Sequence, residues 1–594
     1  MSSPRFSPSA SPDRIASKTP SQQRPPSASS AQEVLSSAQL RERLARAAEH
    51  SGTELVVIDV RETLPFTESH LIFSTNFPYN RLDIEAPVRI PRLSVPIVIV
   101  DGDGALLDKA HARLRGLGYT HIALLSGGVA QWQRDGFPVY AGFNVRSKAF
   151  AEVVEHHAQT PAIDYVAFRD LPDGPPIVLD SRTRDEYHNA TVPSAFHAPG
   201  ADLVRVVRDL VPDENTPIVV ACGGRTRSII GAQSLIDAGV PNPVFSLRNG
   251  TGGLRLAGHA REHGAKRYAA PPSARSLDWA ISAVQHAKPD VAVFTASDVA
   301  AWRADSHRTL YILDLREQQA RDALPVADAA PVAGGQLVQE IDLHAPVIGA
   351  RVLLVDDDDL VRATMTASWV QQIGGFDVAI APASAASLEN VAAVSNAQNA
   401  QAVPHVQAVP TAAHTWQSDA NAAVPASASV TAQSLAKELQ ASTDDILIID
   451  LARSPAFRNG HIAGALWALR DSWQHVWRTD GAAKRIVLTS EDGRLAALAW
   501  ADWSNAHVDA GNPSDVRVLA GGTRSWADAG MPTQGVEDNG APVHPYPDVW
   551  LGPQQRGGDV LPDVRAYLDW EIDLVHQVEH DPDFRALIRL AYTH

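Results

Sequence analysis

The sequence predicts an α/β protein made of tandem domains, each with a central, mostly parallel sheet covered by helices on both faces. Apolar runs that end in an aspartate recur roughly every 120 to 136 residues, at Asp59, Asp180, Asp314 and Asp450. A second apolar run ends 40 to 42 residues after each of them, at Asp101, Cys222, Asp356 and Ser490. Strands that alternate with helical stretches favour parallel pairing, because the crossover helices cover the faces of the sheet.

The length of the chain agrees with this division. Its 594 residues exceed what one hydrophobic core serves and suit about four domains of roughly 100–200 residues each. We expect four repeats, over residues 36–145, 146–270, 271–385 and 429–540. Residues 1–35 are rich in Ser and Pro and predict a disordered segment. Residues 386–428 are rich in Ala, Gln and Val, are interrupted by Pro, and predict a linker.

Residues 541–594 form a C-terminal tail with a helical pattern. Val564, Tyr567, Leu568 and Val575 fall at the spacing of one helix face, between acidic residues. This pattern predicts an amphipathic helix that docks on one of the domains. A helix that binds a separate partner is the alternative.

Smaller motifs recur within the repeats. His70 and His461 each lie 11 residues after the strand-ending aspartate, and Thr191 stands at that position in the second repeat. The third repeat lacks the histidine. We predict it from three features: Asp314, Arg316 and the apolar run 352–355. Late strand-to-helix turns are marked by Gly127-Gly128, Gly521-Gly522 and, in a weaker copy, Asn249-Gly250.

The only cysteine of the chain, Cys222, follows an apolar run and precedes a helical pattern. Backbone amides at the start of a helix converge on one point, and Gly223 and Gly224 let them approach an anion closely. Arg225 and Arg227 add positive charge, so we expect the pKa of the thiol to be lowered and the thiolate to be reactive near neutral pH. The alternative is a buried cysteine that packs as a small hydrophobe.

The segment from Cys222 to Arg227, a cysteine followed by four residues and an arginine, resembles the active loop of the rhodanese sulfurtransferases. The run 177–182, followed by Glu186-Tyr187, resembles the opening of a rhodanese domain. The resemblance implies a persulfide on Cys222 and an arginine, Arg227, that closes the loop. It also implies two further groups of residues. Substrate would be bound by Gly223, Gly224, Arg225, Thr226, Arg227 and Ser228, with Asp180 and Arg182 in support.

The other three repeats lack this chemistry. Asp101, Asp356 and Ser490 stand at the cysteine position, and Leu106, Val361 and Leu495 at the arginine position. A carboxylate or hydroxyl without a closing arginine cannot carry sulfane sulfur in the same way. We therefore expect only the second repeat to be active.

The resemblance implies a sulfurtransferase that moves sulfane sulfur from a donor such as thiosulfate to cyanide or a thiol. Its partners would be small-molecule sulfur donors and acceptors, with a protein thiol as a further candidate acceptor. A scaffold, or a sulfur-carrier or redox-sensing protein whose inactive repeats bind partners, is the alternative. Phosphatase or arsenate reductase chemistry is disfavoured, because the related phosphatases have five residues between cysteine and arginine.

Net charge and cysteine content exclude further classes of function. The formal net charge of −17 argues against a general affinity for nucleic acid or anionic membranes. A single cysteine excludes an intramolecular disulfide, and the sequence contains neither a signal-peptide core nor a membrane-spanning apolar run. We expect a cytoplasmic protein with no cofactor and no metal. The acidic run 356–359 is interpreted as a solvated loop, and His156-His157 as a polar helix face.

Overall fold

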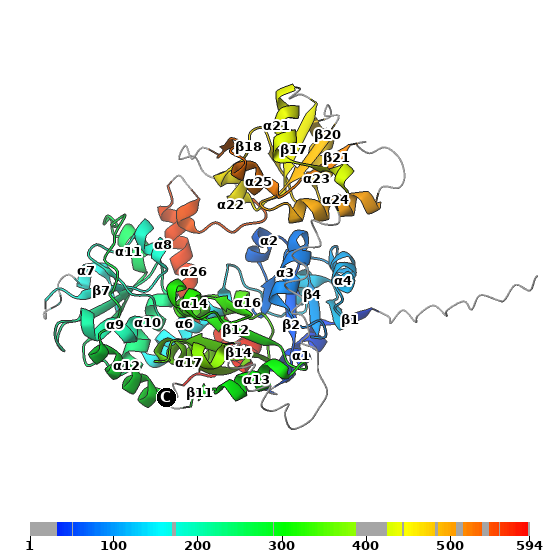
Figure 1. Ribbon diagram of the computed structural model, residues 1–594. Coiled ribbons are helices and arrows are strands. Elements are labelled where there is room, and N and C mark those ends of the chain that lie inside the picture. The colour runs from blue at the N-terminus through cyan, green and yellow to red at the C-terminus, as the bar shows by residue number, and fades with distance from the viewer. Residues whose placement is uncertain are drawn as a thin grey trace, which may run out of the picture.

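The computed structural model describes residues 32–49, 52–168, 171, 174–288, 290–387, 424–441, 445–480, 485–506, 515–536, 546–556 and 559–591. Within these ranges the chain forms four five-stranded sheets, and every strand in them runs parallel to its neighbours. Helices flank the sheets (Figure 1). The α/β fold class predicted from the sequence is confirmed.

All four sheets share one strand order. Numbered by position in its own repeat, each sheet runs first, fifth, fourth, second, third. The fourth strand is therefore central in every sheet, and the chain crosses over on either side of it. In open parallel sheets such a reversal leaves a crevice at the carboxyl ends of the strands, where ligands bind.

The first two repeats contain the following elements. Repeat one comprises β1 (Glu33–Leu35), α1 (Ser37–Glu49), β2 (Val56–Asp59), α2 (Thr63–Glu68), β3 (Ser74–Asn76), the 3-10 turn η1 (Tyr79–Arg81), α3 (Leu82–Arg89), β4 (Ile97–Val100), α4 (Leu107–Gly116), β5 (Ile122–Leu125) and α5 (Gly128–Arg134). Helix α6 (Val145–Ala158) leads into repeat two. Repeat two comprises β6 (Ala162–Ile163), α7 (Tyr165–Phe168), β7 (Ile177–Asp180), α8 (Arg184–Asn189), β8 (Phe196–His197), α9 (Leu203–Leu210), β9 (Ile218–Ala221), α10 (Thr226–Asp237), β10 (Val244–Leu247) and α11 (Gly250–Leu256).

Helix α12 (Ala274–Ala287) leads into the third repeat. Repeat three comprises β11 (Ala292–Val293), α13 (Ala296–Ala304), β12 (Leu310–Asp314), α14 (Gln318–Ala323), β13 (Ala329–Pro331), α15 (Gly334–Gln339), α16 (Ile341–His344), β14 (Ala350–Asp356), α17 (Val361–Ile373), β15 (Phe376–Pro382) and α18 (Ala383–Ala386).

The fourth repeat and the tail complete the described chain. Repeat four comprises η2 (Ala426–Ala428), β16 (Ser429–Val430), α21 (Ala432–Ala441), β17 (Ile446–Asp450), α22 (Ser454–Asn459), β19 (Leu466–Trp467), α23 (Trp473–Asp480), β20 (Arg485–Thr489), α24 (Arg494–Ala506), β21 (Val516–Leu519) and α25 (Gly522–Asp528), with β18 (His461–Ile462) and β22 (Thr533–Gln534) paired antiparallel beside it. The tail comprises η3 (Pro553–Gln555), α26 (Leu561–Glu579) and α27 (Pro582–Leu587).

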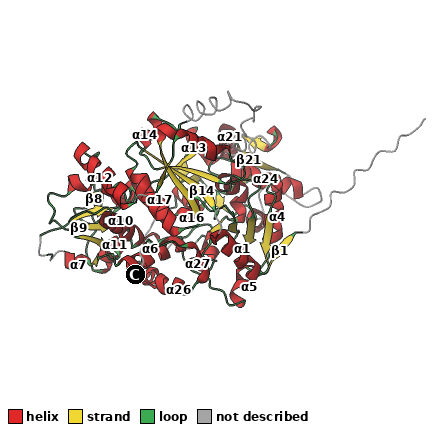
Figure 2. Cartoon of the chain, turned by 90° about the horizontal axis from the view of Figure 1, so that it is seen from below, coloured by secondary structure: helices red, strands yellow, loops and turns green. Residues whose placement is uncertain are grey.

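The central strands are apolar because both of their faces are buried. In β14, Val352 and Leu354 pack against the helices α15 to α17, whereas Leu353 and Val355 pack against α13 and α18. Figure 2 shows α13, α16 and α17 around β14. Alternate side chains of a strand point to opposite faces, so a continuous apolar run is needed where helices cover both.

The end of the second strand in each sheet was predicted correctly from the sequence. Strands β2, β7, β12 and β17 end at the four aspartates named from the sequence. In the first three repeats an arginine two residues later forms a paired ion bridge with the aspartate, as between Arg316 and Asp314 in repeat three. Asp314 is 2% exposed and Arg316 3% exposed, so this pair is buried.

Some predicted boundaries differ from the structure. Residues 33–35, assigned to the disordered segment, form β1, because their backbone pairs with β5 in register Glu33 to Ala123. Residues 426–428, assigned to the linker, form η2. Ala386, also assigned to the linker, ends α18. Residues 1–31 and 388–423 of those two segments lie outside the described residues.

The repeats are joined in two different ways. One apolar core runs through repeats one and three and includes Phe584 and Leu587 of α27. Repeat four lies apart from this core, at the top of Figure 1. It meets repeat one through the ion pair between Arg470 and Asp83, at 2.7 Å, and through Ile84, which packs against the apolar core of repeat four. Among the described residues, no helix combines the length and the apolar character needed to cross a membrane.

We expect Arg316→Ala to destabilise repeat three. Removing one partner of a buried ion pair leaves the other charge uncompensated, which costs about 3–5 kcal/mol. Faster hydrogen–deuterium exchange in peptides covering β12 and β14 would measure this loss. Arg275→Ala, at an exposed position of α12, is the matched control and should leave this exchange unchanged. Equal exchange in all three proteins would contradict the role of the pair.

Candidate functional site

Cys222 lies directly after β9, the central strand of the second sheet, and before α10. Its side chain is 2% exposed. The Sγ atom donates a hydrogen bond to Ser228 Oγ at 3.5 Å, and the Ser228 hydroxyl donates to the carbonyl of Arg225 at 2.8 Å. The thiol is thus fixed between the end of the sheet and the first turn of α10.

The loop after Cys222 is held by the start of α11. The amide of Thr251 donates to the Cys222 carbonyl at 2.9 Å, and that of Gly252 donates to the Gly223 carbonyl at 3.1 Å. Gly250 has a φ of +50°, and a Cβ there would lie 2.3 Å from the Cys222 carbonyl oxygen. Only glycine permits this approach. The sequence showed the turn but not its contact with the cysteine loop.

Asp180 and Arg182 form a buried ion pair at the end of β7. Arg182 donates to both carboxylate oxygens of Asp180, at 3.0 and 2.7 Å, and to the carbonyl of Ala190 at 2.6 Å. The hydroxyl of Thr191 donates to the same carboxylate at 2.6 Å. Thr191 therefore adds a bond to the buried aspartate at the position where repeats one and four have histidine.

The two arginines of the loop have different surroundings. Arg225 turns toward α6, where it donates to both oxygens of Glu152 at 2.6 Å and also pairs with Glu155. Arg227 donates to both oxygens of Glu186 at 2.7 Å and to Gln336 at 2.9 Å. Burial favours the neutral acid, but the Arg227 guanidinium lowers the pKa of Glu186 to about 2.

Burial raises the pKa of the Cys222 thiol above its ordinary value. The charge of Arg227 and the bond with Ser228 oppose this rise, and the nearby charge of Glu571 adds to it. The sequence predicted the reverse, a thiolate near neutral pH. That prediction is wrong for this arrangement because burial outweighs Arg227, and because Arg225 is held by two glutamates of α6.

A carboxylate from the C-terminal helix also reaches the loop. Glu571 of α26 is 2% exposed, and its Oε1 accepts a hydrogen bond from the Thr226 hydroxyl at 3.0 Å. Leu568 lies against Gly224 and Gly252. Helical spacing in the tail predicted a docked apolar face, but no local signal in the sequence connects Glu571 with a loop about 345 residues earlier.

In repeat one, a carboxylate fills the corresponding loop. The Asp101 side chain accepts from the amides of Gly104 and Leu106, both at 2.7 Å. Within the described part of the chain, by contrast, the amides of Gly223 and Gly224 donate to no other group of the protein. At the positions of Gly104 and Leu106 the second repeat has Arg225 and Arg227, whose amides likewise have no acceptor among the described residues.

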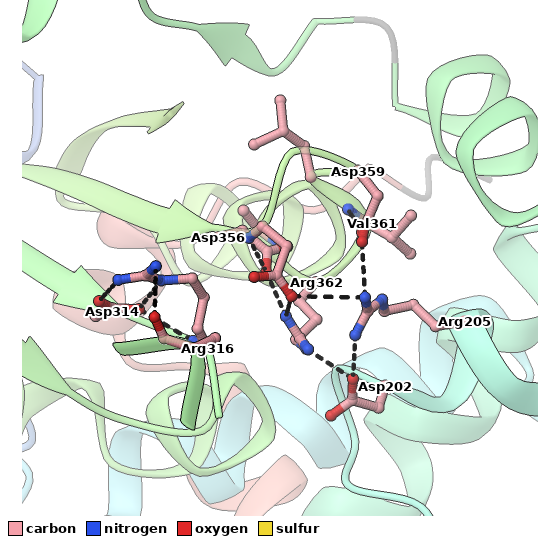
Figure 3. Close-up of polar contacts among 12 residues, drawn as sticks. Asp202, Arg205, Asp314, Arg316, Asp356, Asp359, Val361 and Arg362 are labelled. Atoms are coloured by element: carbon pink, nitrogen blue, oxygen red, sulfur yellow. Dashed lines mark hydrogen bonds and ion pairs between the residues drawn. The ribbon is translucent and has the colours of Figure 1, made fainter. Parts of the chain in front are cut away.

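Repeat three fills its loop in a related way (Figure 3). The buried Asp356 accepts from Arg362 at 2.6 Å and from the amide of Ala363 at 3.0 Å. Arg362 also bonds to Asp202, and Asp359 bonds to Arg205, so the loop joins repeats two and three. The acidic run 356–359 is not simply a solvated loop, as the sequence suggested, because Asp356, Asp357 and Asp359 pair with these arginines. Burial raises the pKa of Asp356 to about 6.

The matches with known proteins agree with this architecture. A model of the rhodanese-like domain matches residues 37–135, 167–255 and 431–529. The structure is similar to that of a thiosulfate sulfurtransferase from Pseudomonas aeruginosa, with 34% sequence identity and a TM-score of 0.80. The match covers 94% of this chain and 100% of that one. No curated protein matches.

Single-domain structures match shorter stretches. The Alr3790 protein from Anabaena is 23% identical over 18% of this chain and 91% of its own, with a TM-score of 0.17. A rhodanese-related protein from Thermoplasma volcanium is 18% identical over 18% of this chain and 98% of its own, with a TM-score of 0.15.

The chain belongs to the rhodanese-like family and has a tandem arrangement of rhodanese-like domains. The family predicted from the residues around Cys222 is confirmed. Repeat three, which the family model does not match, has the same strand order as the other repeats. Together the domains and the match with a thiosulfate sulfurtransferase support membership of a sulfurtransferase-like family.

We expect Arg227→Gln to raise the pKa of Cys222 further, because the variant removes the charge that opposes the effect of burial. The pH dependence of alkylation by iodoacetamide would measure the change. Arg227→Lys, which keeps the charge, should shift the profile less than Arg227→Gln. Arg184→Gln, at an exposed position of α8, should leave it unchanged. An unaltered profile in Arg227→Gln would contradict this role of Arg227.

Proposed function

We propose that the protein is a sulfurtransferase in which Cys222 carries sulfane sulfur as a persulfide. The observation that supports this most directly is the loop itself. Four residues separate Cys222 from Arg227, and the loop amides of Gly223 and Gly224 have no acceptor among the described residues. Amides that converge beside a thiol stabilise an anionic sulfur.

The proposed reaction is a double displacement. After the thiol loses its proton, the Cys222 thiolate attacks the outer sulfur of thiosulfate. A new sulfur–sulfur bond forms, the bond to the sulfonate sulfur breaks, and sulfite leaves with the bonding electrons. In the second half, cyanide or a thiolate attacks the terminal sulfur of the persulfide, and the Cys222 thiolate leaves.

Residues of the second repeat would have different roles in this reaction. Arg227 would favour both the thiolate and the persulfide anion, and the Ser228 hydroxyl would hold the sulfur in place. Asp180 and Arg182 would keep the end of the sheet rigid. Arg225, which we predicted to bind substrate, would instead anchor the loop to α6, because two glutamates occupy its guanidinium.

The inactive segments would complete this site rather than act on substrate. Gln336 of α15, in repeat three, accepts a hydrogen bond from Arg227. Glu152 of α6 and Glu571 of α26 contribute two further contacts to the loop. The surroundings of Cys222 are therefore built from side chains that lie far apart in the sequence.

We expect incubation with thiosulfate, or with another sulfane donor, to add the mass of one sulfur atom to the wild-type protein and none to Cys222→Ser. Intact-protein mass spectrometry, followed by cyanide treatment to release thiocyanate, measures both half-reactions. No adduct with any sulfane donor would refute the proposed function.

The chain offers a matched control for the loop. Ser490 occupies the cysteine position of repeat four, where Leu495 stands in place of the arginine. The double variant Cys222→Ser/Ser490→Cys moves the only thiol into that loop and should gain no sulfur. A relocated thiol that gains sulfur as fast as Cys222 would show that the surroundings of Cys222 are not required.

A further inference from the structure

Glu571 is a buried carboxylate beside the loop that would bind the sulfur donor. Its Oε1 accepts from Thr226, whereas its Oε2 is buried with no hydrogen-bond partner. A Cβ built on Gly224 would lie 2.9 Å from that Oε2. An unpaired carboxylate oxygen therefore lies against the same loop whose free amides would bind the donor.

The cations near the loop do not leave an excess of positive charge. Arg225 is matched by Glu152 and Glu155, and Arg227 is matched by Glu186. Arg182 is matched by Asp180, and a further cation is Lys148 of α6, whose ammonium donates to the Phe143 carbonyl.

Aromatic rings surround that ammonium. It lies 5.1–5.5 Å from the ring centroids of Trp550, Tyr567 and Trp570. Burial lowers the pKa of Lys148 to about 8, with the charge of Glu571 opposing this shift. Among the described residues, no arginine forms an ion pair with Glu571, whereas Glu152, Glu155 and Glu186 each pair with one.

The unpaired charge of Glu571 affects how strongly a negatively charged sulfur donor is repelled near Cys222. The repulsion between Glu571 and a donor grows in proportion to the donor's charge, and it is strong where water is excluded. Thiosulfate carries two negative charges, whereas a persulfide of an uncharged thiol carries at most one. The penalty imposed by Glu571 is therefore about twice as large for thiosulfate as for a singly charged persulfide at the same place.

We propose that Glu571 is a specificity-determining residue that selects sulfane donors with at most one negative charge over dianionic donors. This inference rests on the proposed sulfurtransferase function. The favoured donor is then a persulfide, R–S–SH. The Cys222 thiolate attacks its terminal sulfur, a new sulfur–sulfur bond forms, and R–S⁻ leaves with the electrons of the broken bond, which gives Cys222–S–SH.

The test compares two donors on the full chain. Rates of Cys222 persulfidation are measured by quenched-flow mass spectrometry with thiosulfate and with 2-hydroxyethyl persulfide, in wild type and in Glu571→Gln. Removing the charge should raise the ratio of the thiosulfate rate to the persulfide rate about tenfold or more. Glu571→Ala serves as a second variant without the charge, and the same shift is expected from it.

Asp569→Asn is the matched control, since Asp569 is an exposed acid on the same helix. It should leave the ratio of the two rates unchanged. An unchanged ratio in both Glu571 variants, or an equal shift in Asp569→Asn, would overturn the role of Glu571 while leaving the sulfurtransferase function intact. Absence of persulfide with either donor in every protein would instead refute the function on which the inference rests.

Discussion

A buried aspartate at the end of the second strand is the constraint on which each repeat depends. Its carboxylate must find partners in place of water, because an unpaired buried charge is costly. In every repeat it accepts from the backbone amide two residues later, at 2.9–3.1 Å. In repeats one to three an arginine side chain also donates to this carboxylate, whereas in repeat four the hydroxyl of Thr523 does so, at 3.2 Å. The turn fixed in this way lies beside the central strand, and in repeat two it supports the loop of Cys222.

The periodic features of the sequence predicted most of the fold. The four aspartates marked strand ends because burial and pairing are local requirements, and the alternation of strands with helical stretches then implied parallel sheets. Repeat three, which we predicted from Asp314, Arg316 and one apolar run, has the same topology as its neighbours. The position of Cys222 after a central strand also followed from the sequence. The boundary at residue 35 was misplaced because β1 exists only through its pairing with β5.

The surroundings of the thiol could not be predicted in the same way. The charge of Arg225 is visible in the sequence, but the glutamates that neutralise it lie on α6, about 70 residues earlier. Glu571 lies on a helix near the end of the chain. Both contacts arise from tertiary packing, which no local pattern encodes. The degree of burial of Cys222, which sets the direction of its pKa, has the same long-range origin.

The two C-terminal helices connect distant parts of the molecule. Helix α26 covers the loop of the second repeat, while α27 reaches repeat one, where Asp583 pairs with Arg41 and Asp581 accepts from Tyr140. A ribosome makes these helices after all four repeats. During synthesis the second repeat therefore emerges with its loop uncovered. Helix α26, which carries Glu571, is added only when translation has passed residue 571. The complete surroundings of Cys222 therefore form late in biosynthesis, and a nascent chain and a completed one differ in what lies around the same sulfur atom.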